Sequence, residues 1–166
     1  MNKASFLDRD GTINVDYGYV YQYEKFEFID GVVDTLKKLQ GKGYLLIIIT
    51  NQSGIARGYF SEEDMKSLHQ KMCDDLLKQG VKIDAIYYCP HLDGCECRKP
   101  GVELFYKAAK DFDIDFSESI VIGDRLRDLS ICEKENVRGF WITKENSAVA
   151  KNITKVCQIS DILAEV

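Results

Sequence analysis

Short apolar runs alternate along this chain with segments in which apolar residues recur at helical spacing. Residues 44–49 form a continuous apolar run, typical of a strand buried on both faces of a parallel sheet. Similar runs predict the remaining strands, which we place at 4–7, 84–88, 119–122 and 139–142. Helical spacing between the strands predicts helices at 30–40, 61–80, 102–112 and 126–136, and more weakly at 159–166.

This alternation predicts an α/β fold, a doubly wound, Rossmann-like parallel sheet with right-handed crossovers. No internal repeat or linker divides the chain, so we expect one domain over 1–166. The tyrosine-rich segment 15–28 lacks helical spacing and is predicted to be a functional loop. The helix after Ser61 is predicted to bury one apolar stripe. Its members are Met65, Leu68, Met72, Leu76 and Leu77.

Composition limits the classes of partner. The 166 residues are 45% hydrophobic and 30% charged, and the net charge of -5 disfavours a nucleic-acid surface. The chain shows no signal-peptide pattern and no apolar run long enough for a bilayer. We therefore expect a cytoplasmic monomer that binds a small anionic molecule, with neither nucleic acid nor membrane as a partner.

Polar residues follow four of the predicted strands. They are Asp8 and Asp10, Thr50 and Asn51, Arg98 and Lys99, and Asp124 and Asp128. Since the carboxyl ends of parallel strands share one edge of the sheet, these groups should meet there. Neighbouring carboxylates ionise together only when a cation joins them. The set suits an aspartate nucleophile beside a general acid, with a divalent metal on the phosphate. The alternative, an ordinary aspartate-rich turn, does not account for four such strand ends.

These segments resemble the four motifs of the haloacid dehalogenase (HAD) superfamily of phosphohydrolases. The matches are Asp-x-Asp-Gly-Thr at 8–12, Thr50, Lys99 and Gly-Asp-x-x-x-Asp at 123–128. The resemblance implies a HAD-like fold and hydrolysis of a phosphate monoester. About forty residues separate the first motif from Thr50, which leaves no room for a cap domain, so loops must cover the site and set its specificity.

The same resemblance implies a role for each motif residue. Asp8 would be the nucleophile that forms an aspartyl-phosphate, and Asp10 would protonate the leaving oxygen and then activate water. Thr50 and Lys99 would hold the phosphoryl group. Mg²⁺ would be bound by Asp8, the main-chain carbonyl of Asp10 and Asp124, while Asp128 would orient Lys99 or the metal-bound waters.

A second cluster lies in the loop before Lys99. Cys89, His91, Cys95 and Cys97 fall within nine residues and predict a closed, tetrahedral Cys₃His site for structural Zn²⁺. The alternative is a loop of free cysteines, which is uncommon at this density. Zinc would fix the direction of Arg98 and Lys99 and take no part in the chemistry.

Several stretches are similar to the family of D-glycero-D-manno-heptose 1,7-bisphosphate 7-phosphatases. They are residues 6–16, 18–20, 26–31, 50–58 and 97–100. The resemblance implies removal of the 7-phosphate from a phosphorylated heptose during heptose biosynthesis. The substrate contacts that it implies are Asp16, Tyr17, Gly18, Tyr19, Thr50, Asn51, Gln52, Ser53, Arg98, Lys99 and Arg125. Arg57 could meet the second phosphate or be a surface charge.

Two other functions remain open at this point. The short spacer 92–94 in the zinc loop and the segment 121–125 resemble histidinol-phosphate phosphatases, whereas residues 53–58 and the loop after Thr12 are of the heptose type, which we favour. A non-catalytic phosphosugar-binding module would have no use for an acid two residues from a nucleophile. The preferred anomer of the sugar stays undetermined.

The remaining polar and aromatic residues suggest structural roles. His69 borders the apolar stripe of its helix and is interpreted as a packing or solvated residue. Trp141 is expected in the core, as are Cys73, Cys132 and Cys157. Four tyrosines could stack on a sugar or pack their own loop. They are Tyr17, Tyr19, Tyr21 and Tyr23.

Overall fold

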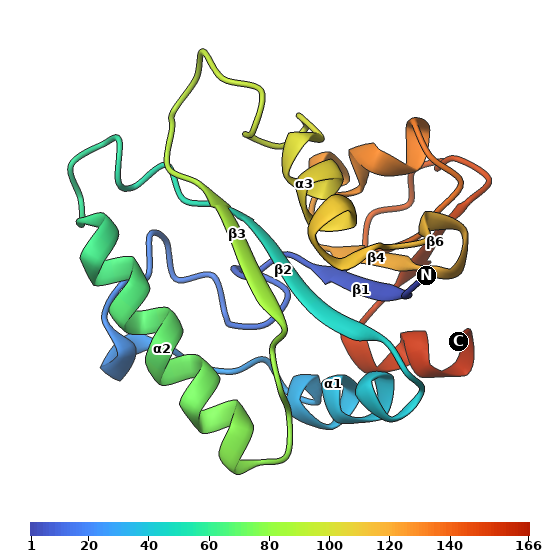
Figure 1. Cartoon of the computed structure of the whole chain (residues 1–166), viewed down its shortest axis with the longest axis horizontal. Coiled ribbons are helices and arrows are strands. Elements are labelled where there is room, and N and C mark those ends of the chain that lie inside the picture. Colours follow the sequence, from blue (N-terminus) through green and yellow to red (C-terminus); the bar gives the residue numbers. More distant parts are fainter.

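A computed structural model describes residues 1–166 and contains one parallel sheet with helices on both faces (Figure 1). The strands are β1 (Ala4–Leu7), β2 (Leu45–Asn51), β3 (Ala85–Cys89), β4 (Ile120–Gly123), β5 (Arg138–Ile142) and β6 (Ile153–Val156). The helices are α1 (Val32–Gly41), α2 (Glu62–Lys78) and α3 (Glu103–Phe112), with 3₁₀ helices η1 (Tyr23–Lys25), η2 (Phe116–Glu118), η3 (Leu126–Glu133) and η4 (Ile159–Ala164). No helix combines the length and the apolar character needed to cross a bilayer.

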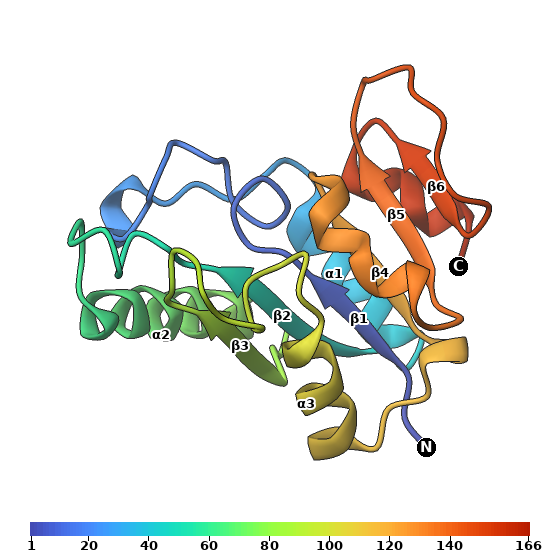
Figure 2. The same cartoon turned by 90° about the horizontal axis from the view of Figure 1, so that it is seen from above.

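The strand order is β3-β2-β1-β4-β5-β6, and every neighbouring pair is parallel. The chain runs outward from β1 to β3, then returns to the other side of β1 at β4, which confirms the predicted doubly wound topology. In Figure 2 the loops after β1 and β2 lie toward the upper left, and the N-terminus lies at the bottom. The ligand-binding edge of the sheet is therefore the upper left one in that view.

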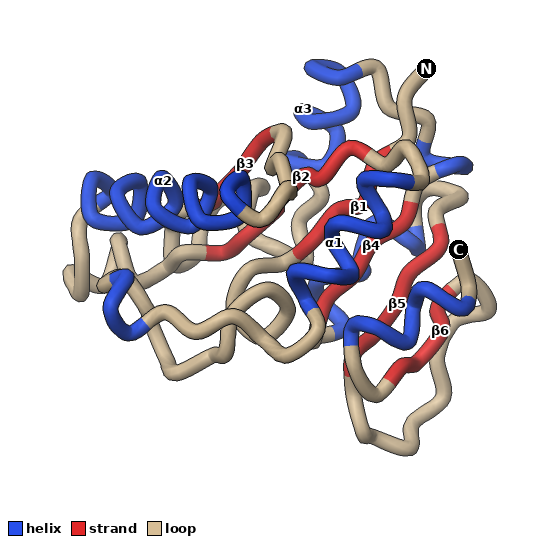
Figure 3. Tube along the Cα trace, turned by 90° about the horizontal axis from the view of Figure 1, so that it is seen from below, coloured by secondary structure: helices blue, strands red, loops and turns tan.

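The two faces of the sheet bury separate cores. Along β2, Leu46 and Ile48 pack with residues of α1 and α2, whereas Ile47 and Ile49 pack with residues of α3. Figure 3 shows α1, α2 and the C-terminal 3₁₀ helix on the same side of the strands. Because both faces are covered, β2 reads as a continuous apolar run rather than an alternating one.

Helix α2 begins with a capping box. The Ser61 hydroxyl accepts a hydrogen bond from the Asp64 amide, and the Asp64 carboxylate accepts one from the Ser61 amide, both at 3.0 Å. These bonds satisfy amides that the first turn of a helix leaves without partners. The connection from β1 to β2 contains only η1 and α1, and the connection from β2 to β3 contains only α2, so no cap domain is inserted.

Three elements differ from the prediction. Strand β6 was not predicted, because its four residues alternate only weakly and form the edge of the sheet beside β5. The helix predicted at 126–136 is the 3₁₀ helix η3, which ends at Glu133, and the terminal helix is the shorter η4. The type and length of these short elements depend on tertiary packing next to the sheet, and local residue spacing does not encode that packing.

Two side chains expected in the core are exposed. Leu77 is 63% exposed, whereas its neighbour Leu76 is completely buried, because the next position along a helix turns away from the stripe. Cys157 is also exposed, after the short edge strand β6, and Cys73 is half-buried. Trp141 and Cys132 are buried as predicted.

The Leu76 and Leu77 pair offers a matched test of this register. Leu76→Ala should lower the free energy of unfolding by about 2–5 kcal/mol, since it opens a cavity in the core. Leu77→Ala should change it by less than about 0.5 kcal/mol, as for other surface substitutions. Urea unfolding followed by circular dichroism measures both, and equal effects would contradict the described face of α2.

Candidate active site

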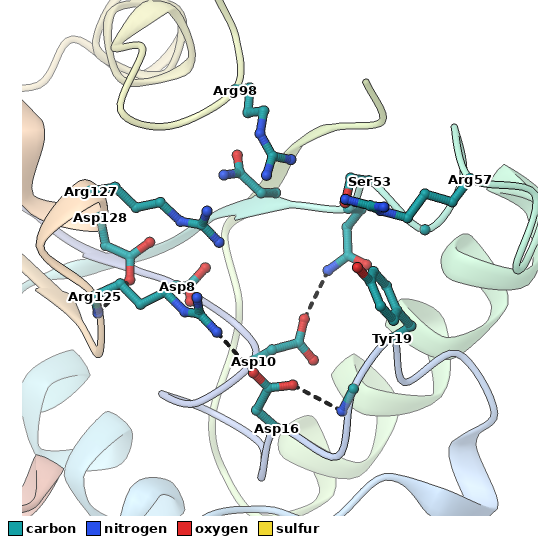
Figure 4. A pocket seen from close by; sticks show the side chains of 14 residues that line it. Asp8, Asp10, Asp16, Tyr19, Ser53, Arg57, Arg98, Arg125, Arg127 and Asp128 are labelled. Carbon is teal, nitrogen blue, oxygen red and sulfur yellow. Dashed lines mark hydrogen bonds and ion pairs between the residues drawn. The ribbon is translucent and has the colours of Figure 1, made fainter. Parts of the chain in front are cut away.

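The loops at the carboxyl edge of the sheet enclose a cavity of about 330 Å³. Figure 4 shows its charged lining, in which arginines approach the acidic side chains from several sides. The least exposed of these acids, Asp8 and Asp128, form its floor. The lining residues are Asp8, Asp10, Asp16, Gly18, Tyr19, Asn51, Gln52, Ser53, Gly54, Arg57, Arg98, Arg125, Arg127 and Asp128. The structure thus brings most of the predicted substrate contacts together, although the chain order separates them widely.

Lys99 forms a buried ion-pair network directly behind the floor of the cavity. Its ammonium lies 3.0 Å from Asp8 Oδ1 and 2.8 Å from Asp128 Oδ1, and it donates a 2.7 Å hydrogen bond to the Ile49 carbonyl. Burial alone would lower the pKa of Lys99, but the charges of Asp8 and Asp128 raise it above its ordinary value. The side chain is only 2% exposed and remains a cation.

Asn51 fixes the backbone that carries Lys99. Its amide nitrogen donates to the Lys99 carbonyl at 3.1 Å, and its oxygen accepts from the Lys99 amide at 2.9 Å. Asn51 lines the cavity as predicted, but both ends of its side-chain amide bond to this neighbouring loop. The end of β2 therefore determines where Lys99 enters the site.

Three carboxylates converge beside Lys99. One oxygen from each of Asp8, Asp124 and Asp128 lies within 4.8 Å of the others. Burial, together with the charges of Asp128 and Asp124, raises the pKa of Asp8 to about 8 against the opposing charge of Lys99. Burial and the charge of Asp128 also raise the pKa of Asp124 to about 6. Asp124 Oδ1 is buried without a hydrogen-bond partner, so the donor set fits a hard divalent cation.

Gly11 permits the close approach of Asp124. It has a φ of +88°, and a Cβ at this position would lie 2.1 Å from Asp124 Oδ2. The main chain of Asp124 is held by the indole of Trp141, which donates to its carbonyl at 3.1 Å. Asp124 is thus confined between the turn after β1 and a buried aromatic residue of β5.

Asp10 is held by three donors. One guanidinium nitrogen of Arg9 lies 2.9 Å from Oδ1 and 3.1 Å from Oδ2 of Asp10. Asn14 donates to Oδ1 at 3.0 Å, and Gln52 donates to Oδ2 at 3.2 Å. Gln52 also donates to the Thr50 hydroxyl at 3.0 Å. These bonds hold the Asp10 carboxylate in one position, in the lining of the same cavity as Asp8.

Some of the predicted residues lie outside the cavity lining. Thr50 and Lys99 are buried behind it, next to residues of the floor. Asp124 belongs to the carboxylate cluster but also lies behind the lining. Tyr17 is exposed, and the structure does not bring it to the cavity.

Aromatic and charged contacts border the cavity mouth. The rings of Tyr19 and Tyr59 meet edge to face at 4.8 Å, and the Arg57 guanidinium lies 5.6 Å from the Tyr19 ring. Across the cavity, Arg125 and Asp16 lie 3.7 Å apart. These contacts join the loop after β1 to the loops after β2 and β4.

Arg127 is a cavity residue that the sequence analysis missed. With Arg57, Arg98 and Arg125 it makes four arginines around one cavity (Figure 4). Arg127 Nε and Arg98 Nη1 are buried without a hydrogen-bond partner, which leaves donors for an anionic ligand. The only signal in the sequence was that Arg127 follows two residues after Arg125. Whether its side chain faces the cavity depends on the orientation of η3.

The predicted zinc ligands lie together in the loop after β3. The Sγ atoms of Cys89 and Cys95 are 3.5 Å apart, and those of Cys95 and Cys97 are 3.6 Å apart. His91 Nδ1 lies 3.5 Å from Cys89 Sγ and 3.3 Å from Cys97 Sγ. Sulfur ligands about 2.3 Å from a tetrahedral ion would be roughly 3.7 Å apart, so this cluster fits a zinc-sized ion.

Comparisons with known proteins agree with this geometry. D-glycero-beta-D-manno-heptose-1,7-bisphosphate 7-phosphatase from Haemophilus influenzae is 50% identical over 137 residues, which cover 78% of this chain and 74% of that protein. The corresponding alpha enzyme from Campylobacter jejuni is 54% identical over 127 residues, covering 76% and 74%. The crystal structure of D,D-heptose 1,7-bisphosphate phosphatase from B. bronchiseptica, complexed with magnesium and phosphate, superposes with a TM-score of 0.87 at 28% identity and covers 99% of both chains.

The parallel fold, its carboxylate edge and these similarities define a HAD-type phosphatase, an enzyme that hydrolyses phosphate monoesters. A family model described as polynucleotide kinase 3 phosphatase matches residues 4–161. The chain belongs to this family of HAD-like phosphatases, as the heptose bisphosphate phosphatase relatives also indicate.

Gly11→Ala should impair the cation site more than the fold. The added methyl group would displace Asp124, and we expect the half-saturating Mg²⁺ concentration for phosphatase activity to rise at least about tenfold. Gly58→Ala is the matched control, since its φ is +77° and an added Cβ meets no atom within 4 Å. Both variants should lose about 1–2 kcal/mol of stability from backbone strain. An equal Mg²⁺ requirement in the two variants would contradict the role of Gly11.

Proposed function

We propose that this chain hydrolyses the 7-phosphate of D-glycero-D-manno-heptose 1,7-bisphosphate through an aspartyl-phosphate on Asp8. The observation that carries the proposal is the position of Asp8 at the cavity floor, within ion-pair distance of Lys99 and beside the carboxylate of Asp10. The names of the relatives from H. influenzae and C. jejuni supply the substrate.

In this proposal each residue acts at a stated atom. A carboxylate oxygen of Asp8 attacks phosphorus, and Lys99 and the Thr50 hydroxyl hold the equatorial phosphoryl oxygens. Asp10 gives a proton to the departing sugar oxygen, and then accepts one from the water that hydrolyses the aspartyl-phosphate. Mg²⁺, bound by Asp8, Asp124 and the main-chain carbonyl of Asp10, would supply positive charge against the phosphoryl oxygens. Asp128 is bonded to Lys99 and keeps its ammonium directed at Asp8.

A bisphosphate also agrees with the charges around the cavity. Lys99 and a cation at the carboxylates suffice for the reacting phosphate, yet four arginines border the same cavity. We propose that Arg57, Arg98 and Arg127 bind the second phosphate and that Arg125 lies beside the reacting one. Asp16, Tyr19 and Ser53 would contact the sugar between the two phosphates.

The proposed activity is tested by comparing substrates. The purified protein with Mg²⁺ should show a kcat/KM for heptose 1,7-bisphosphate well above that for histidinol phosphate, and both anomers should be assayed because the relatives are named for different ones. Asp8→Asn should lower kcat at least about a thousandfold while the protein stays folded. A preference for histidinol phosphate would replace the proposed substrate, and full activity of Asp8→Asn would exclude the mechanism.

We also propose that Cys89, His91, Cys95 and Cys97 bind one structural Zn²⁺. The four side chains of the cluster would fill all four positions of a tetrahedral ion, so the ion would have no place for substrate. The cluster ends directly before Arg98 and Lys99. Binding of zinc would hold this loop and thereby the entry direction of both cations.

Elemental analysis should find about one zinc per chain. Cys95→Ser should lose the metal and lower both stability and activity, whereas Cys157→Ser should keep it, since Cys157 is exposed and lies outside the cluster. A metal-free protein with full activity and unchanged stability would contradict the zinc proposal.

A further inference from the structure

Arg9 is a buried cation between the two motif aspartates. Its residue exposure is 0%, and it is the largest fully buried side chain of the protein. A guanidinium without contact to water is costly unless its donors find partners. The contacts of Arg9 therefore indicate the role of this side chain.

Those partners connect the site to two distant segments. One terminal nitrogen of Arg9 contacts both oxygens of Asp10 and also donates to the Val20 carbonyl at 2.8 Å. The other terminal nitrogen lies 3.1 Å from Nε2 of His69, a residue of α2 that is only 6% exposed. The guanidinium thus joins Asp10 to the loop after β1 and to a helix outside the cavity.

The protonation state of His69 follows from its surroundings. Burial lowers the pKa of His69 to about 3, and the charge of Arg9 acts in the same direction. The ring is therefore neutral near pH 7. Because arginine only donates hydrogen bonds, Nε2 of His69 is the acceptor and its proton lies on Nδ1.

We propose that Arg9 and His69 are positioning residues that hold the Asp10 carboxylate at the leaving-group oxygen. This inference rests on the proposed function. Asn14 and Gln52 each contact one oxygen of Asp10, but Arg9 contacts both. Without the acceptor at position 69, the guanidinium would keep hydrogen bonds from only one of its terminal nitrogens. It could then turn about that nitrogen, and the Asp10 carboxylate bonded to it would shift.

Comparing substrates with different leaving groups tests the positioning role. A residue that only stabilises the fold would affect both substrates equally. A sugar alkoxide needs a proton from Asp10 to depart, whereas p-nitrophenolate departs without one. We expect His69→Leu to lower kcat/KM at least about tenfold for the heptose bisphosphate and several-fold less for p-nitrophenyl phosphate. His69→Gln keeps an acceptor oxygen and should restore most of the loss. The loss should appear in kcat, with KM little changed.

Three further variants complete the experiment. Asp10→Asn removes the acid completely and so gives the largest expected change in the ratio of kcat/KM for the two substrates. Leu76→Ala loosens α2 without touching Arg9 or the cavity, and should leave the ratio of the two kcat/KM values at the wild-type level. Arg9→Met should match His69→Leu if it folds, and the result on His69 stands if it does not.

The outcomes separate this inference from the proposed function. If Asp10→Asn discriminates between the substrates but His69→Leu lowers both equally, or behaves like Leu76→Ala, the positioning role is wrong and the function stands. Failure of His69→Gln to restore activity would also overturn it. If the wild-type protein does not hydrolyse the heptose bisphosphate, the proposed function and this inference both fail.

Discussion

The ammonium of Lys99 is the group on which the rest of the site depends. It is buried among Asp8, which follows β1, the Ile49 carbonyl of β2, and Asp128, which lies in η3 just after β4. A buried charge is tolerated only when its partners surround it, so β1, β2 and β4 must end at one place for the protein to fold. The constraint that stabilises this part of the sheet also places a cation against the carboxylate that we propose as nucleophile.

The charges of the cavity are divided by depth. Acidic groups lie at the floor, where Asp8, Asp124 and Asp128 form a cluster suited to a divalent cation. Arginines on the loops and on η3 stand around them, and two of these keep buried donors without partners in the protein. With a divalent cation at the carboxylates, a ligand that carries phosphate at both ends would match both regions, whereas a neutral ligand would leave the arginine donors unpaired. This division favours a bisphosphate more directly than the fold does, since one fold serves many substrates.

The loops take the place of a cap domain. The segment after β1 contacts the segment after β2 through Tyr19 and Tyr59, and it contacts the loop after β4 through Asp16 and Arg125. The loop after β3 is held by its Cys and His cluster, and Asn51 bonds it to the end of β2. In the proposed function, specificity would therefore depend on side chains that hold one another in position. A substitution in one loop is transmitted to the others through these contacts.

The sequence by itself determined the order of β1 to β5 and of the main helices between them, the parallel sheet and the meeting of the motif residues at one edge. It could do so because continuous apolar runs and strand-end carboxylates are local signals, and parallel topology brings the strand ends together. Only the tertiary structure decided that Arg127 lines the cavity, that Leu77 is exposed and that His69 touches Arg9. Each of these depends on the rotation of a helix about its own axis against the sheet. That rotation is set by packing between segments far apart in the chain, so no local pattern of residues contains it.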